Sequence, residues 1–254
     1  MSIRQITSSA ALYFAPVVER AVPFRWFELA WKFLEERGLP VAYFDTSCAD
    51  FPGDDAKEFT TWKSRLLNSL QRDAVCDLGL GCLPAGTDDV EMWRGRIAIE
   101  LANGLLYVGV DEELAPDLTK LLRDASELAR IGLDLRYGIS YKASLADAPE
   151  SYAAGFTVYS LPEMVEVLLG EGKRTRLDAW SDAMRGERRY LDGLFRGVYP
   201  ASILSDAHVA RANLKSTGFG KLSPLDAGLW LWEVPDSEIA LAEAALDKLG
   251  LVIQ

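Results

Sequence analysis

Apolar residues recur along the chain at two spacings, which predict its helices and strands. Phe27, Ala30, Trp31 and Leu34 follow one another at three- and four-residue intervals, the spacing of one face of an amphipathic helix. A helix from Pro23 to Arg37 is therefore predicted. Further helices are expected over Ala56 to Leu70, Leu114 to Ile131, Pro162 to Leu169, Thr175 to Leu194, Ser205 to Leu214 and Asp236 to Gly250.

Short apolar runs between these helices predict strands. Arg96 to Leu101 and Leu105 to Val110 flank Asn103-Gly104, a dipeptide typical of β-hairpins. Ala10 to Ala15 and Val41 to Asp45 lie on either side of the first helix, so these two strands are expected to pair in parallel. Other strands are expected over Leu135 to Tyr141, Gly155 to Tyr159 and Leu229 to Val234, with Leu251 to Ile253 as an edge or closing strand.

The order of these elements favours the α+β class. Strands and helices are mixed without a fixed repeat, and one clear hairpin stands among them. We expect a mixed, largely antiparallel β-sheet with helices packed on it, as a single compact unit over residues 1–254. A weak subdivision is conceivable near residues 170–173, where Gly170-Glu171-Gly172 interrupts the pattern. The small-residue stretch from Val75 to Asp89 is expected to be irregular.

Two tryptophans mark one face of the predicted strand near the end of the chain. Side chains of a strand alternate between its faces, so Trp230 and Trp232 share one face and Leu229 and Leu231 the other. Because both faces are apolar, we expect a central strand that is covered on each side. Packing of the tryptophans against the closing helix is favoured over a ligand wall.

Composition and charge indicate the class of partner. The chain has 254 residues, of which 49% are hydrophobic, enough for a sizeable core. Its formal net charge is −11, which repels phosphate backbones and argues against direct nucleic-acid binding. A basic protein partner is favoured, although the same charge also serves solubility alone.

Cysteine usage and hydropathy favour a cytoplasmic protein. Cys48, Cys76 and Cys82 are an odd number without the paired spacing of a zinc site, as expected of a reduced chain. No apolar run approaches the roughly 20 residues that cross a bilayer, and no leader pattern is apparent at the first residues. We therefore expect no contact with a membrane.

Residues capable of catalysis are sparse. His208 is the only histidine and has no recognisable nucleophile motif beside it, so a structural role is favoured. Gly79-Leu80-Gly81 resembles half of a dinucleotide fingerprint, but Pro84 stands where the helix would have to begin. We expect no catalytic residues, no metal and no cofactor.

Two acidic loops are the candidate partner-binding sites. Each contains several carboxylates and lies close in sequence to an aromatic residue: Phe51 and Phe59 for the first loop, Trp93 for the second. Charge accelerates association with a basic cleft and an exposed ring supplies affinity, although solvated loops are the simpler interpretation. The candidate residues are Asp54, Asp55, Asp88, Asp89, Glu91 and Trp93.

The last part of the chain contains a series of short motifs. They are Arg196-Gly197-Val198-Tyr199-Pro200, Leu204, His208, Gly220-Lys221-Leu222, the strand from Leu229 to Val234, and Leu246 with Leu249-Gly250-Leu251. In these elements the chain resembles a family of type VI secretion system immunity proteins. The similarity covers roughly the C-terminal 100 residues, with a looser match at Tyr152 to Phe156, and Ser202 stands where family members often carry asparagine.

This resemblance implies a cytoplasmic protein that protects the producing cell from its own toxin. Such a protein would bind a cognate effector, for example a nuclease, and occlude its basic active-site cleft. Two other hypotheses remain open. One is an enzyme that uses paired carboxylates without metal or histidine, and the other is a scaffold or assembly subunit.

Overall fold

The computed structural model describes residues 5–17, 21–51, 56–86, 92–130, 132–145, 148–154 and 193–252. Its strands are β1 Ile6–Phe14, β2 Tyr43–Asp45, β3 Lys57–Glu58, β4 Asp77–Cys82, β5 Gly95–Glu100, β6 Leu105–Asp111, β7 Leu135–Ser144, β8 Ala201–Ser205, β9 Lys221–Pro224 and β10 Leu229–Glu233. Its helices are α1 Phe24–Glu35, α2 Phe59–Gln71, α3 Leu118–Ala129, α4 Pro149–Ala153, α7 Asp206–Arg211, α8 Leu214–Thr217 and α9 Asp236–Lys248.

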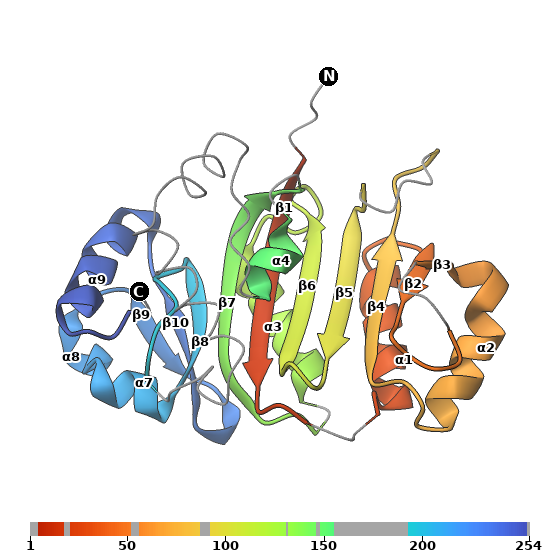
Figure 1. Ribbon diagram of the computed structural model, residues 1–254. Coiled ribbons are helices and arrows are strands. Elements are labelled where there is room, and N and C mark those ends of the chain that lie inside the picture. Colours follow the sequence, from red (N-terminus) through yellow and green to blue (C-terminus); the bar gives the residue numbers. More distant parts are fainter. Residues whose placement is uncertain are drawn as a thin grey trace, which may run out of the picture.

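The strands form one ten-stranded sheet in the order β3-β2-β4-β5-β6-β1-β7-β8-β10-β9 (Figure 1). Neighbouring strands of this sheet pair in antiparallel fashion, from β3 with β2 at one edge to β9 with β10 at the other. The expected α+β class, with a largely antiparallel sheet and helices packed on it, is confirmed.

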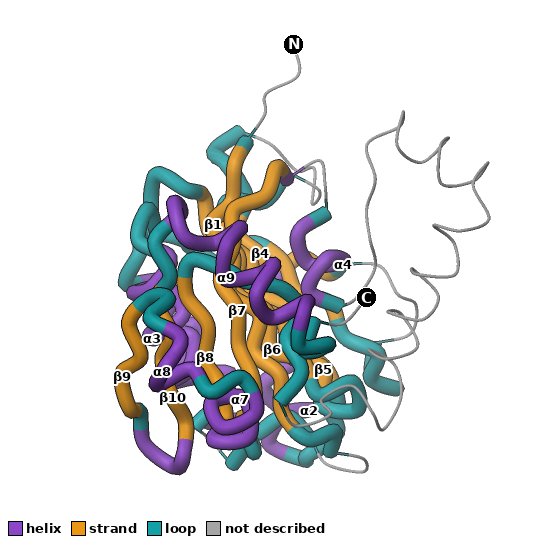
Figure 2. The backbone as a smooth tube through the Cα atoms, turned by 90° about the vertical axis from the view of Figure 1, so that its left-hand side faces the viewer, coloured by secondary structure: helices purple, strands orange, loops and turns teal. Residues whose placement is uncertain are grey.

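Helices lie on both faces of the sheet. Figure 2 shows α3 on one side of the strands and α4 on the other. We call these sides the α3 face, which α1 and α2 also cover, and the α4 face, which α7 and α9 also cover. In β1, Leu12 and Phe14 point to the α3 face and Ala11 and Tyr13 to the α4 face. All four are at most 1% exposed, so this strand is buried on both sides.

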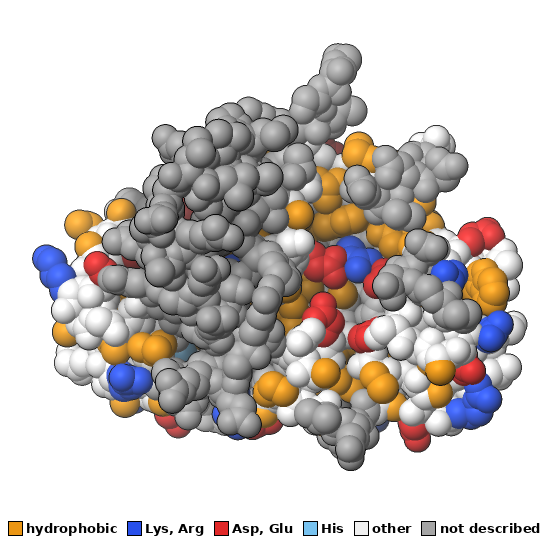
Figure 3. Space-filling model, in the orientation of Figure 1, with side chains coloured by type: hydrophobic (Ala, Val, Ile, Leu, Met, Phe, Trp, Pro, Cys, Tyr) orange, Lys and Arg blue, Asp and Glu red, His pale blue; other side chains and the backbone are white. Residues whose placement is uncertain are grey.

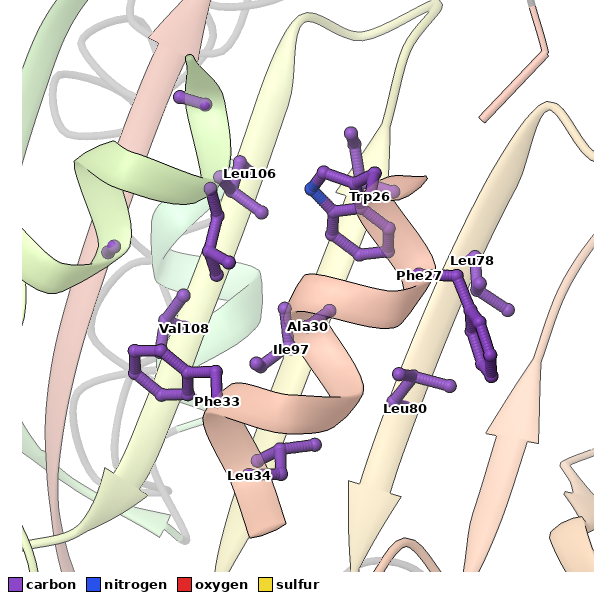
Figure 4. Packing of buried hydrophobic residues seen from close by; sticks show 14 of the residues in the cluster. Trp26, Phe27, Ala30, Phe33, Leu34, Leu78, Leu80, Ile97, Leu106 and Val108 are labelled. Carbon is purple, nitrogen blue, oxygen red and sulfur yellow. The ribbon is translucent and has the colours of Figure 1, made fainter. Parts of the chain in front are cut away.

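Helix α1 packs against the α3 face of the sheet (Figure 4). Its residues Trp26, Phe27, Ala30 and Leu34 are fully or almost fully buried, at the helical spacing expected from the sequence. Across from them lie aliphatic side chains of three neighbouring strands: Leu78 and Leu80 of β4, Ile97 of β5, and Leu106 and Val108 of β6.

The predicted hairpin is confirmed. Strands β5 and β6 pair in antiparallel register from Gly95 opposite Val110 to Glu100 opposite Leu105. The turn closes at Gly104, whose φ of 63° suits glycine and whose N–H donates to the carbonyl of Leu101 at 3.2 Å.

Two expectations about the first half of the sheet are wrong. The first strand does not pair with the second, because β4, β5 and β6 lie between β2 and β1. Within the stretch from Val75 to Asp89, which was expected to be irregular, Asp77–Cys82 forms β4, an interior strand of the sheet. Gly79 and Gly81 of this strand allow side chains of β2 to lie directly on its backbone.

The C-terminal part largely follows its sequence pattern. Trp232 is 1% exposed and packs on the α4 face with Ala242 and Leu246 of α9, while Leu231 points to the α3 face. Strand β10 is covered on both faces but is not central, because only β9 lies beyond it. The closing segment makes one parallel bridge, between Val252 and Phe195.

The helix expected from Ser205 to Leu214 is divided into α7 and α8. Ser205 and His208 form a capping box at the start of α7, and Asn213, at a φ of 49°, separates the two helices. The strand expected at Gly155 to Tyr159 and the break near residues 170–173 lie outside the described residues, as do the helix expected at Pro162 to Leu169 and most of that at Thr175 to Leu194. Within the described ranges, no helix combines the length and apolarity needed to cross a membrane.

Leu34→Ala tests the core beneath α1. Leu34 is fully buried, so the substitution should lower the free energy of unfolding by about 2–5 kcal/mol through lost burial and a residual cavity. Leu241→Ala is the matched control, since Leu241 is 64% exposed and its loss should cost less than about 0.5 kcal/mol. Urea denaturation of both variants measures the difference, and equal costs would contradict the described packing.

The three cysteines should differ in reactivity. Cys48 and Cys82 are buried and Cys76 is exposed, and burial raises the pKa of the Cys82 thiol to about 12. At pH 8 the Cys82 group therefore stays a protonated, inaccessible thiol. Ellman's reagent should modify one thiol per chain rapidly in native protein and all three after unfolding. Cys76→Ser should abolish the rapid phase.

Candidate functional site

The α4 face of β4 and β5 differs from the rest of the sheet in its side chains. Alternate residues of these strands point to the α3 face and are aliphatic, including Leu78, Leu80, Ile97 and Ile99. The intervening residues, which point to the α4 face, are small or charged: Asp77, Gly79, Gly81, Arg96, Ala98 and Glu100. This part of the sheet therefore carries a polar surface directly above the core.

A hollow lies on this surface. Gly79 is between Asp45 of β2 and Ala98 of β5 in the cross-strand register, and the Asp45 carboxylate covers its backbone. These residues help to line a cavity of about 300 Å³. We call it the acidic hollow; the residues of its lining that matter here are Asp45, Asp77, Gly79, Arg96, Ala98, Glu100 and Glu150. Figure 3 shows acidic and basic side chains gathered on this face.

The two glycines of β4 are required by β2. A Cβ atom at Gly81 would lie 2.0 Å from Cζ of Tyr43, and one at Gly79 would lie 2.5 Å from Oδ1 of Asp45. The Tyr43 ring and the Asp45 carboxylate thus rest on bare backbone. Burial raises the pKa of Tyr43 to about 12. The sequence Gly79-Leu80-Gly81 is explained by this packing inside a sheet, not by a phosphate-binding turn.

Arg96 joins β2 to α4 across the hollow. Its Nη1 and Nη2 donate to the Asp45 carboxylate at 2.7 and 3.2 Å, and Nη2 also donates to Oε1 of Glu150 at 3.0 Å. A further bond runs from its Nε to the other oxygen of Glu150. The side chain is 13% exposed. Burial lowers the pKa of Arg96, but the Glu150 and Asp45 carboxylates outweigh burial and hold it well above its usual value.

Two further carboxylates face each other at the other end of the hollow. Asp77 and Glu100 are directly opposite in the antiparallel pairing of β4 with β5. Asp77 accepts hydrogen bonds from the backbone N–H of Ser47 at 2.7 Å and from its hydroxyl, and Glu100 accepts one from Asn103 Nδ2 at 2.5 Å. The lining thus contains four carboxylates and one guanidinium, a formal charge of −3.

This arrangement is suited to binding a cationic group. Asp45 and Glu150 are held as hydrogen-bond acceptors by Arg96, which fixes their oxygens. Among the residues described by the structure, no group of three or more His, Cys, Asp and Glu side chains converges as a metal site would require. The lining of the hollow offers oxygen acceptors from four carboxylates.

A second buried arginine anchors the C-terminal end of α4. Arg196 Nη1 donates to the Tyr13 hydroxyl at 2.6 Å, its Nη2 donates to the Tyr152 carbonyl, and its guanidinium lies 3.9 Å from the centre of the Tyr152 ring. The Tyr199 and Tyr152 hydroxyls are 2.7 Å apart. With 8% exposure, Arg196 is part of the core. The segment Arg196 to Pro200 therefore contributes packing around α4.

His208 is likewise a buried structural residue. It is 1% exposed, its Nδ1 lies 2.8 Å from the Ser205 hydroxyl, and its Nε2 lies 3.0 Å from the Leu194 carbonyl. Its ring stacks on Tyr137 at 5.1 Å between centroids. These contacts account for the only histidine of the chain without a catalytic role.

The predicted partner-binding residues have a divided outcome. Five of them lie outside the described residues: Asp54, Asp55, Asp88, Asp89 and Glu91. Trp93 is 6% exposed and packs edge-on against Tyr107 at 6.3 Å, and Phe51 and Phe59 are equally buried. The expectation of exposed rings beside the acidic loops is therefore wrong. Partner binding by the loops themselves stays a prediction.

The acidic hollow was not predicted from the sequence. The signal existed in Asp77-Leu78-Gly79-Leu80-Gly81 and in Arg96-Ile97-Ala98-Ile99-Glu100, where aliphatic residues alternate with small or charged ones. That alternation identifies strands with one polar face. It does not show that the two polar faces are adjacent or that Glu150 lies beside them.

Comparisons with known proteins identify a shared fold. No family model matches the sequence, and no match was found among curated proteins. The structure is similar to that of the Pseudomonas aeruginosa type VI secretion system (T6SS) protein PA0821, with a TM-score of 0.54 and 11% sequence identity. The similarity covers 98% of this chain and 73% of that chain. At this identity, the likeness shows the architecture and not the activity.

Arg96→Met tests the ion pairs that shape the hollow. Loss of the guanidinium leaves Asp45 and Glu150 close together without their cation, so the free energy of unfolding should fall by about 2–4 kcal/mol. Arg130→Met is the control, because Arg130 is 51% exposed and its pairs should contribute less than about 1 kcal/mol. Chemical denaturation at pH 7 measures both.

Adding Asp45→Asn and Glu150→Gln to Arg96→Met removes the unpaired charges and should restore part of the lost stability. A triple variant no more stable than Arg96→Met would argue against an electrostatic origin of the loss.

Proposed function

We propose that this chain is an immunity protein that binds a cognate T6SS effector toxin in the cytoplasm and occludes its basic active-site cleft. The observation that carries this proposal is the acidic hollow, an acceptor-rich cavity of formal charge −3 built on the α4 face of the sheet. A basic cleft is the complementary surface. An inhibitor of this kind needs affinity and shape, and no chemistry of its own.

Three further observations support the proposal. The net charge of −11 favours rapid association with a basic protein, because long-range attraction raises the rate of encounter. The segment from Arg196 to Leu251 resembles T6SS immunity proteins. PA0821, which has the same fold, is itself described as a T6SS protein.

The alternative functions have less support. A carboxylate-dependent enzyme needs two carboxyl groups placed to act together on a substrate, whereas Arg96 already occupies both Asp45 and Glu150. A scaffold needs a broad exposed apolar patch. In the described ranges the exposed large hydrophobic residues are single leucines: Leu114, Leu241 and Leu249.

Toxin inhibition tests the proposed function. The purified chain is titrated into the toxin domain encoded by the adjacent gene, and residual toxin activity is measured at each ratio. Activity should fall to zero at about one chain per toxin, because one inhibitor occupies one cleft. A T6SS toxin from an unrelated effector pair is the control and should stay active. Full activity of the adjacent toxin in excess of this chain would refute the proposal.

A further inference from the structure

We propose that the acidic hollow is the surface that binds the effector toxin, and that it receives a lysine or arginine side chain of that toxin. This inference rests on the proposed function and adds the contact surface and the chemistry of the contact. The surface is the α4 face of β2, β4 and β5, closed on one side by Glu150 of α4.

The space available suits a long side chain. The cavity of about 300 Å³ has room for more than a single water molecule. Ala98 is among the small residues of its lining, whereas the Asp45 carboxylate covers Gly79. The apolar stem of a lysine or arginine can lie against Ala98 while its charged end reaches the carboxylates.

The charges specify a cation. The lining carries four carboxylates and one guanidinium, and two of the carboxylates belong to Asp77 and Glu100, which are directly opposite on neighbouring strands. A basic group that enters the hollow is attracted by this net negative charge. Arg96 fixes Asp45 and Glu150 beside them, so the acceptors are positioned before the partner arrives.

The same lining argues against other ligands. Phosphate groups would meet a formal charge of −3. A divalent metal would need several converging ligands, and no such cluster occurs among the described residues. An ammonium or guanidinium group on a protein loop fits both the charge and the open side of the hollow.

The central experiment removes charge without changing shape. The double variant Asp77→Asn/Glu100→Gln keeps an acceptor oxygen for Ser47 and for Asn103 while removing two negative charges. Isothermal titration calorimetry against the adjacent gene's toxin domain should show a Kd raised roughly 10- to 100-fold. The wild-type Kd should also depend more steeply on salt than that of the variant.

A matched control separates the hollow from overall charge. Glu28→Gln/Glu35→Gln removes the same number of charges from exposed positions of α1, on the opposite face of the sheet. Its Kd should rise less than about threefold, the effect of net charge alone. Thermal unfolding followed by circular dichroism verifies that both double variants are folded.

A second variant fills the hollow and keeps every charge. Ala98→Leu places a larger side chain in the lining of the hollow and should raise the Kd at least tenfold by excluding the toxin side chain. The control Ala240→Leu, on the exposed surface of α9, should leave the Kd unchanged. If Ala98→Leu fails to fold, the charge variant decides the question.

The outcomes distinguish the two proposals. Tight binding by wild type with unchanged binding by Asp77→Asn/Glu100→Gln would overturn the hollow as the contact and leave the proposed function standing. Equal weakening by the α1 control would overturn it in the same way. Failure of wild type to bind the toxin would overturn both.

Discussion

Two buried guanidinium groups fix α4 on the sheet, and the candidate site depends on that placement. Arg96 holds the start of α4 through Glu150, and Arg196 holds its end through the Tyr152 carbonyl. Burying an arginine is costly, so each guanidinium must be supplied with several acceptors. Carboxylates supply them for Arg96, whereas a hydroxyl and a backbone carbonyl are among those of Arg196. The carboxylates around Arg96 line a charged cavity, whereas the groups around Arg196 are part of a closed core.

The sequence was informative where structure is local. The spacing of apolar residues in α1, the Asn103-Gly104 turn and the alternation of Trp232 with Leu231 each depend on neighbours within a few residues. The hollow depends on distant pairs: Arg96 meets Asp45 and Glu150 at separations of 51 and 54 residues. The glycines of β4 predicted an irregular segment, because the side chains that pack on them, Tyr43 and Asp45, belong to another strand.

The comparison with PA0821 separates architecture from recognition. Two chains with 11% identity share a fold because many side chains satisfy the same pattern of buried and exposed positions. Part of the hollow, including Asp77 and Glu100, lies on the polar side of two strands, where the buried pattern of the fold does not specify the residue. A surface of this type can change its partner while the sheet beneath it stays the same.

The position of β1 in the sheet has a consequence for biosynthesis. This strand occupies residues 6–14, yet its neighbours β6 and β7 end at residues 111 and 144. A nascent chain therefore exposes both edges of this apolar strand until residue 111 has left the ribosome, and one edge until residue 144 has followed. Topologies with such long-range pairing fold slowly and are prone to aggregate meanwhile. Under the proposed function, the chain would accordingly have to be made ahead of the toxin that it inhibits.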